Sequence, residues 1–189
     1  MGRGAPAEPT EASLHEAALA YLARYAATRA GLLRVLNRRV AKWVAASEGL
    51  GDDAAAAARA AARRVADRLE AAGAVNDAVF ATQRARSLKR AGKSARAIGA
   101  HLGAKGVPPE LAAAAAQTDA PAELAAAALH LRKRRMGPFR LRETSPETRR
   151  RELGSLARAG FAHATAAAAL GLTRDEAEAV IRAFHASQD

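Results

Sequence analysis

The stretch that decides the fold is SLKRAGKSARAIGAHLGAKGV, residues 87–107. Its Gly-Lys-Ser at 92–94 matches the end of the nucleotide-binding phosphate loop, G-x-x-x-x-G-K-[ST], whose first glycine would fall at Ser87. The residues ahead of it carry several cations and lack the alternation of the buried strand that such a loop follows. Since glycine and strand are both missing, we predict instead that Gly92 ends one helix and Ser94 caps the next.

The chain repeats this pattern. LARYAATRAGLLRVLNRRV, residues 22–40, aligns with residues 88–107 and places Thr28 at the position of Ser94. The larger apolar residues of the two segments also coincide, at helical spacing. Because no Gly-Lys precedes Thr28, the shared hydroxyl indicates a helix cap and not a phosphate ligand.

A weaker echo relates LARAGF at 156–161 to LGAKGV at 102–107. Together with apolar residues at helical spacing along the chain, these repeats predict an all-α fold, an elongated tandem array of three-helix units. The expected boundaries are a disordered tail over 1–12, a first repeat over 13–76, a second over 77–119, and a third over 120–186 with an extra C-terminal helix.

Helix starts and core residues follow from local patterns. Two capping boxes mark expected helix starts, Ser13 with Glu16 and Thr173 with Glu176. Aromatic residues are scarce, so we expect most of them to fill the cores rather than to stack on bases. Those expected inside are Tyr21, Tyr25, Trp43, Phe80 and Phe161. Phe139, in an irregular segment with glycine and proline, is the aromatic expected at the surface.

Composition narrows the class of protein. Hydrophobic residues make up 50% of the 189, but alanine dominates them and aromatics reach only 4%, which favours helices with thin cores. There is no cysteine, so disulfides and thiolate chemistry are excluded. The start of the chain lacks the apolar run of a secretory signal, and no segment reads as a membrane span. We therefore expect a cytoplasmic protein and, because capped repeats need no partner, a monomer.

No catalytic, cofactor-binding or metal-binding site is expected. The 5 histidines lack the close spacing of a helical metal motif. Most acids fall near predicted helix starts, where they complement the helix dipole, and no nucleophile motif is present. The sequence therefore predicts a binding protein and not an enzyme.

The formal net charge of +11 predicts attraction to polyanions. Two basic clusters concentrate this charge and are the candidate contacts with DNA or a nucleoprotein. The first holds Arg84, Arg86, Lys89, Arg90, Lys93 and Arg96; the second holds Arg132, Lys133, Arg134 and Arg135, continues through Arg140 and Arg142, and ends with Arg149, Arg150 and Arg151. Two alternatives stay open, namely a solvated arginine-rich surface and a DNA-binding protein of helix-turn-helix type.

The second repeat resembles the RecX family of bacterial recombinase regulators. That family's second repeat reads approximately R-x-G-x-S-x-x-x-I-x-x-x-L-x-x-K-G-V, matched here by Arg90, Gly92, Ser94, Ile98, Leu102, Lys105, Gly106 and Val107. The junction before it, L-x-x-x-G-L-[LI]-[ND]-D-x-x-[FY]-A, is matched by Leu69, Gly73, Val75, Asn76, Asp77, Phe80 and Ala81, with Ala74 in place of the usual leucine.

The resemblance implies three helical repeats, in agreement with the order derived above. It also implies a non-enzymatic modulator of RecA, the ATP-driven DNA recombinase. Such a protein would lie in the groove of the RecA–DNA filament and inhibit the ATPase and strand exchange of RecA. Its expected setting is homologous recombination, DNA repair and the SOS response.

Overall fold

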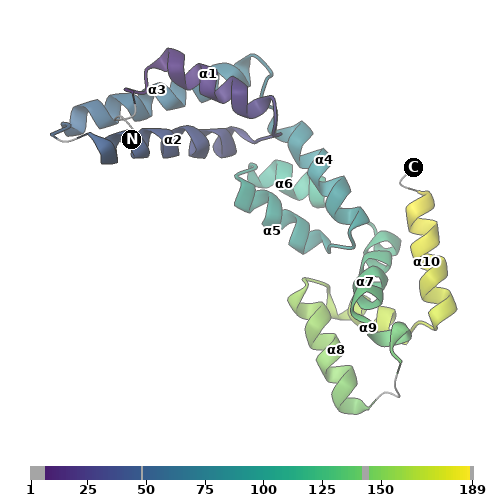
Figure 1. Ribbon diagram of the computed structural model, residues 1–189. Helices are drawn as coiled ribbons and strands as arrows, with labels where there is room; N and C mark the ends of the chain where they lie inside the picture. The colour runs from purple at the N-terminus through teal and green to yellow at the C-terminus, as the bar shows by residue number, and fades with distance from the viewer. Residues whose placement is uncertain (1–6, 48, 142–144, 188–189) are drawn as a thin grey trace. The chain divides into compact units, whose positions relative to one another are not determined.

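The computed structural model describes residues 7–47, 49–141 and 145–187, so residues 1–6 of the predicted tail lie outside the described part. Across these residues the chain forms ten α-helices and one 3-10 helix, with no strand (Figure 1). Their bounds are α1 (Glu11–Leu22), α2 (Arg29–Ala46), α3 (Asp52–Ala71), α4 (Asp77–Arg90), α5 (Ala95–Lys105), α6 (Pro109–Ala116), α7 (Ala120–Arg134), η1 (Gly137–Phe139), α8 (Pro146–Arg158), α9 (His163–Gly171) and α10 (Arg174–Ala186). The predicted all-α tandem array of three-helix repeats is confirmed.

Alanine fills much of the interior, as the composition predicts. On α3 the buried residues are mostly alanines, with Val65 and Leu69 as the larger ones. An alanine buries little apolar area, so each helix pair is held by a few large side chains. Within the described residues, no helix is both long enough and apolar enough to cross a membrane.

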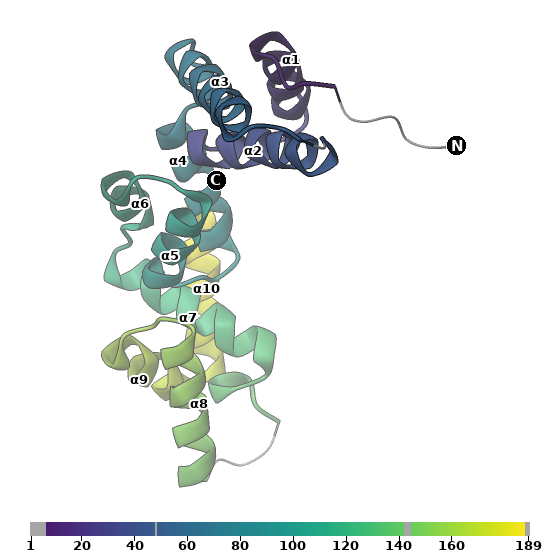
Figure 2. The same cartoon turned by 90° about the vertical axis from the view of Figure 1, so that its left-hand side faces the viewer.

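The chain divides into two compact units. The first unit contains Met1–Phe80 and Lys105–Val107, and the second contains Ala81–Ala104 and Pro108–Asp189. In the first unit α1, α2 and α3 lie side by side (Figures 1 and 2). Leu14 of α1 and a stripe of α2, which includes Leu32 and Trp43, pack into one core with the larger residues of α3.

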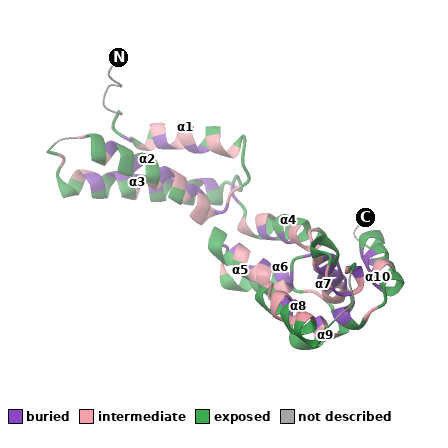
Figure 3. Cartoon of the chain, turned by 60° about the horizontal axis from the view of Figure 1, so that its bottom comes forward, coloured by how far each residue is buried: buried purple, intermediate pink, exposed green. Residues whose placement is uncertain are grey.

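In the second unit α7 is the central helix. It packs against both α9 and α10, and its middle, from Ala125 to Leu129, is buried (Figure 3). Leu129 and Leu131 of α7 share a core with Phe161, Ile181 and other residues from α8 to α10. Each such large side chain contributes about 1.5–3 kcal/mol on burial, so this core holds the unit together.

Two expectations about aromatic residues are wrong. Phe139, expected at the surface, is 6% exposed, because η1 turns the segment after α7 back into the core beside Leu131 and Leu170. Tyr25, expected inside, is 57% exposed. Helix α1 ends at Leu22, so Tyr25 lies beyond it and the helical spacing no longer places its side chain on the inner face. The other aromatics expected inside range from intermediate to buried.

The two predicted capping boxes have different outcomes. Thr173 and Glu176 form the reciprocal pair, with the Thr173 amide donating to Glu176 Oε2 at 2.8 Å, so this box is confirmed. The box at Ser13 is wrong. Helix α1 begins earlier, with Thr10 as its cap, and the Ser13 amide donates to Thr10 Oγ1 at 3.2 Å.

Both hydroxyls that the repeat aligned are helix caps, as predicted. Thr28 Oγ1 accepts from the Gly31 amide at 2.8 Å and donates to the Lys105 carbonyl at 2.7 Å, all within the first unit. Asp77 Oδ1 accepts a hydrogen bond at 2.8 Å from the amide of Arg29, which follows Thr28 at the start of α2. Each cap therefore joins one repeat to the next as well as starting a helix.

Candidate polyanion-binding surface

The turn at 91–94 joins α4 to α5 and confirms the predicted helix end. Gly92 has a φ of +73°, and the Lys93 amide donates to the Leu88 carbonyl at 3.1 Å, as at a glycine-terminated helix. Ser94 Oγ is occupied by protein groups on both sides, since it accepts from the Ala97 amide and donates to the Ala159 carbonyl. The turn is therefore built as a cap between repeats, not as a phosphate loop.

The first amide of α5 is also engaged. Ala95 donates its N–H to the two carboxylate oxygens of Glu123, at 3.1 and 3.3 Å. Burial raises the pKa of Glu123, while the Ala95 amide and the charge of Lys89 oppose that rise. This carboxylate stands where a helix start would otherwise attract an anion.

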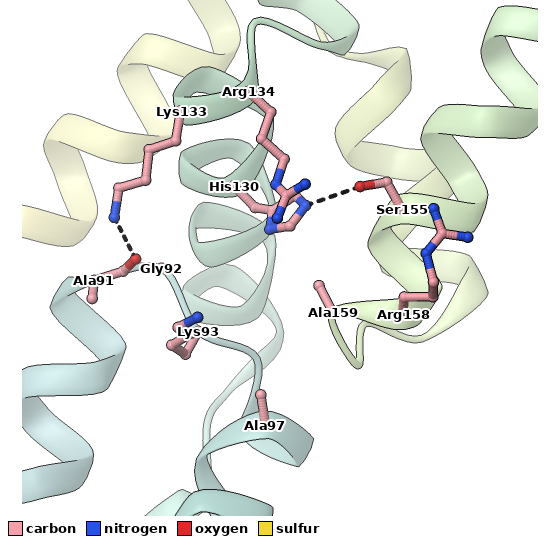
Figure 4. A pocket seen from close by; sticks show the side chains of 10 residues that line it. All are labelled: Ala91, Gly92, Lys93, Ala97, His130, Lys133, Arg134, Ser155, Arg158 and Ala159. Atoms are coloured by element: carbon pink, nitrogen blue, oxygen red, sulfur yellow. Dashed lines mark hydrogen bonds between the residues drawn. The ribbon is translucent and has the colours of Figure 1, made fainter.

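Beside the same turn, the second unit has a pocket of about 750 Å³ (Figure 4). Its cations come from three elements, and small residues of the turn, α5 and the end of α8 form the rest of the wall. The polar residues that line it are Lys93 in the turn, His130, Lys133 and Arg134 on α7, and Ser155 and Arg158 on α8. Of the residues that the structure describes, no carboxylate lines it.

Hydrogen bonds fix part of this lining. Lys133 Nζ donates to the Ala91 carbonyl at 2.6 Å, which places its ammonium group against the turn. His130 Nε2 lies 3.4 Å from Ser155 Oγ, so the imidazole is held between α7 and α8. In the view of Figure 4, Lys93 is on one side of the pocket and Arg158 on the other.

The electrostatics of the pocket oppose further positive charge. Burial lowers the pKa of His130, and the charges of Arg134, Lys93 and Lys133 lower it further. The ring of Phe161 packs edge-on against the imidazole of His130, with the two ring centroids 5.9 Å apart, and adds to the desolvation of the imidazole. The pocket is thus a place where an anion would find unmatched positive charge.

Apart from Lys93, the residues of the first basic cluster lie on α4 and α5 and do not line the pocket. Arg84, Arg86, Arg90 and Arg96 are exposed, and Lys93 lines the pocket itself. Lys89 donates to the Gln117 carbonyl, and Arg84 Nε donates to His101 Nε2 at 3.0 Å. Among the described residues, no member of this cluster forms a salt bridge with a carboxylate.

The second cluster is divided by the fold. Lys133 and Arg134 line the pocket, whereas Arg132 pairs with Glu178 at 3.0 Å. Arg135 caps the end of α7 with a φ of +53°. The remaining members are on or before α8: Arg149, Arg150 and Arg151 are exposed, Arg151 lies 3.6 Å from Glu147, and Arg142 is outside the described residues.

Arg140 has a structural position within this cluster. It is paired with Glu152, a carboxylate only 5% exposed, which also accepts from the Gly137 amide at 3.0 Å. This pair fastens η1 to α8 and takes Arg140 away from the basic surface.

Sequence reasoning missed three residues of the pocket, His130, Ser155 and Arg158. A signal for Arg158 exists, since it precedes Ala159 in the LARAGF echo, the segment that meets the Ser94 cap. His130 and Ser155 lie on the predicted helices without a local pattern that marks them.

The first unit has a related but less basic arrangement. Its junction at Thr28 borders a smaller pocket of about 260 Å³, to which Arg34 and Arg38 contribute. Arg29, Arg64 and Arg68 of this unit are paired with acids, whereas other cations, such as Lys42, Arg59 and Arg63, are exposed and form no salt bridge with the described residues.

The fold and this surface define a class of protein, the tandem arrays of three-helix repeats. A family model described as RecX, second three-helix domain, matches residues 76–115. A regulatory protein RecX from Myxococcus xanthus is 41% identical over 162 residues, which cover 82% of this chain and 84% of that protein. The chain therefore belongs to the RecX family of regulatory proteins.

Two further relatives agree with this assignment. A regulatory protein RecX from Agrobacterium fabrum is 36% identical over 108 residues, covering 57% of this chain and 58% of that protein. The crystal structure of RecX from Lactobacillus salivarius matches with a TM-score of 0.55 over 93% of this chain and 97% of that one. At 16% identity this second likeness supports the fold.

Proposed function

We propose that this protein binds the nucleoprotein filament that RecA forms on DNA and inhibits the ATPase and strand exchange of RecA. Family membership supports RecA as the partner. The observation that carries the mode of binding is the pocket of the second unit, where cations from a turn and two helices converge and no carboxylate of the described part of the chain joins them.

Such a surface suits a partner that displays many phosphates. The exposed arginines of α4 and α5 continue the positive charge away from the pocket, so several phosphates can be contacted at once. Lysine and arginine contacts to phosphates set position without reading sequence, which agrees with a regulator that acts wherever RecA has assembled. A protein bound in this way acts by covering surface that the filament needs, and it requires no catalytic group.

The test is the DNA-dependent ATPase of RecA, measured against increasing amounts of this protein. The variant replaces three exposed cations of the second unit, Arg86→Gln, Arg90→Gln and Lys93→Gln, and its control replaces three exposed cations of the first unit, Lys42→Gln, Arg59→Gln and Arg63→Gln. We expect the wild type and the control to inhibit well below equimolar RecA, and the variant to need about tenfold more protein.

Free DNA in matched amounts separates filament binding from simple DNA sequestration. Inhibition that appears only when the protein is abundant enough to cover the DNA would favour the alternative, a general DNA-binding protein of helix-turn-helix type. Absence of inhibition at an excess over RecA would overturn the proposal.

A further inference from the structure

The pocket of the second unit indicates which chemical group it receives. We propose that it binds a phosphodiester of a single nucleic-acid strand, between Lys93 on one side and Arg158 on the other. This inference rests on the proposed function, since the filament contains such a strand. It identifies the pocket as the place on the basic surface where one phosphodiester of the strand binds.

The lining of the pocket favours an anion held by several groups at once. Lys133 is anchored by its bond to the Ala91 carbonyl, so its charge is fixed in place and little side-chain entropy remains to be lost. Alanine and glycine form the walls of the turn, which lets a ligand approach the backbone closely. An anion here would meet cations from three elements, as bidentate and multiple contacts to phosphate require.

The size of the pocket favours a phosphodiester over a carboxylate. A volume of about 750 Å³ lies in the range of pockets that hold small ligands of nucleotide size, and is more than a single carboxylate would fill. A phosphodiester carries the same single charge as a carboxylate, but it belongs to a strand whose neighbouring phosphates can contact the remaining cations. Arg90 and Arg96, each next in sequence to a lining residue, are exposed outside the pocket for the neighbouring phosphates of a strand. The lining offers no tyrosine, tryptophan or phenylalanine for a base to stack on, which argues against a free nucleotide.

His130 makes the binding sensitive to protons. Lys133 and Arg134 from its own helix, Lys93 from the turn and Arg158 from α8 all face the pocket that it lines, and Ser155 is its hydrogen-bond partner. Burial lowers the pKa of His130 in the free protein, and the charges of Arg134, Lys93 and Lys133 lower it further. A bound phosphodiester offsets them and raises that pKa, so binding takes up a proton and strengthens as the pH falls.

The experiment uses the full chain and a thymidine tetranucleotide without terminal phosphates, whose diester charges do not titrate near neutral pH. The imidazole signals of His130 are followed by NMR through a pH titration, with and without this probe, and the other histidines serve as internal controls. We expect the probe to move the His130 midpoint upward and to bind several-fold more tightly at about pH 5.5 than at about pH 7.5.

Two variants test the assignment. The double variant Lys93→Gln with Arg158→Gln should weaken binding of the probe by about tenfold. Lys93→Arg is the control that keeps the positive charge. His130→Gln should lose most of the pH dependence of probe binding between about pH 5.5 and about pH 7.5. Thermal melts of each variant verify that the fold is kept.

The inference is overturned if the probe leaves the His130 midpoint unchanged, or if an octaglutamate peptide or ATP moves it more than the probe does. The ATPase of RecA is read separately. If RecA is inhibited but the probe does not shift His130, the pocket assignment fails and the proposed function stands. If the probe binds in the pocket and RecA is unaffected, the proposed function fails and the pocket assignment stands.

Discussion

Ser94 donates its hydroxyl proton to the carbonyl oxygen of Ala159, 65 positions later in the chain, at 2.7 Å. Ser94 Oγ also accepts from the Ala97 amide at 3.2 Å, so one fully buried side chain starts α5 and holds the end of α8. Thr28 makes the equivalent pair of bonds in the first unit. The cap and the joint between repeats are thus a single device, and the pocket is built beside it.

Replacing Ser94 with alanine should destabilise the second unit. The change leaves the Ala159 carbonyl and the Ala97 amide without their partner in a buried place, which costs about 2 kcal/mol of unfolding free energy. Urea unfolding followed by circular dichroism measures this loss. Ser87→Ala on α4 is the control, because Ser87 is exposed and alanine suits a helix. Equal stability of the two variants would contradict the role of Ser94.

Gly160, which follows Ala159, should not accept a side chain. Its φ is +90°, and a Cβ there would lie 2.6 Å from Ser94 Oγ, so Gly160→Ala must both strain the backbone and displace the cap. We expect a loss of about 3 kcal/mol. Gly103→Ala is the matched control on α5, where a Cβ meets nothing within 4 Å, and it should gain about 0.5–1 kcal/mol. A Gly160→Ala variant with the stability of the wild type would contradict this prediction, because it would show that the contact between Ser94 and the end of α8 can rearrange to accept a side chain.

Arg140→Met should be costly although it alters an arginine of a basic cluster. It leaves the buried Glu152 carboxylate without its cation, and removing one partner of a buried pair costs about 3 kcal/mol. Arg151→Met makes the same change in an ion pair whose side chains are 74% and 79% exposed, and should cost less than about 0.5 kcal/mol. The free energies of unfolding of the two variants are compared by urea unfolding. Similar losses in both would mean that the ion pair of Arg140 stabilises the fold no more than an exposed ion pair does.

His130 should make stability depend on pH. In the unfolded chain it titrates near pH 6.5, whereas burial and its cationic neighbours lower its pKa in the folded chain. Between the two values the unfolded chain binds more protons, so this histidine's contribution to the unfolding free energy falls as the pH falls below about 6.5. His130→Gln should therefore lose less stability than the wild type from about pH 7.5 to about pH 5.5.

The measurement is urea unfolding across that range, with His185→Gln, at an exposed position, as the control. A control that flattens the pH dependence as much as His130→Gln does would assign the effect to the histidines in general.

Much of the fold could be predicted because its signals are local. Caps at Thr28, Ser94 and Thr173 need contacts only three residues away, and apolar spacing marks the inner face of each helix. The failed box at Ser13 is of the same kind, since Thr10 offers an equivalent hydroxyl three residues before it. Local rules predict that a helix starts here, and neighbouring candidates compete for the exact residue.

The basic surface was predicted as two clusters, but which charges remain available depends on distant acids. Arg140 has the same local sequence character as its neighbours, yet it is neutralised by Glu152 on another helix. Phe139 likewise reads as a loop residue, and η1 turns it into a core that residues far along the chain complete.

By itself the sequence determined an all-helical chain of three-helix repeats, its helix caps and its excess of positive charge. Helix formation and capping follow from residues within a turn or two of each other, and the charge follows from composition. The tertiary structure decided that Lys93, His130 and Arg158 share one pocket. These residues come from the turn and from two helices, and they meet because the Ser94 hydroxyl and the buried core of α7 fix those elements together. Helix propensity and capping carry no information about that packing.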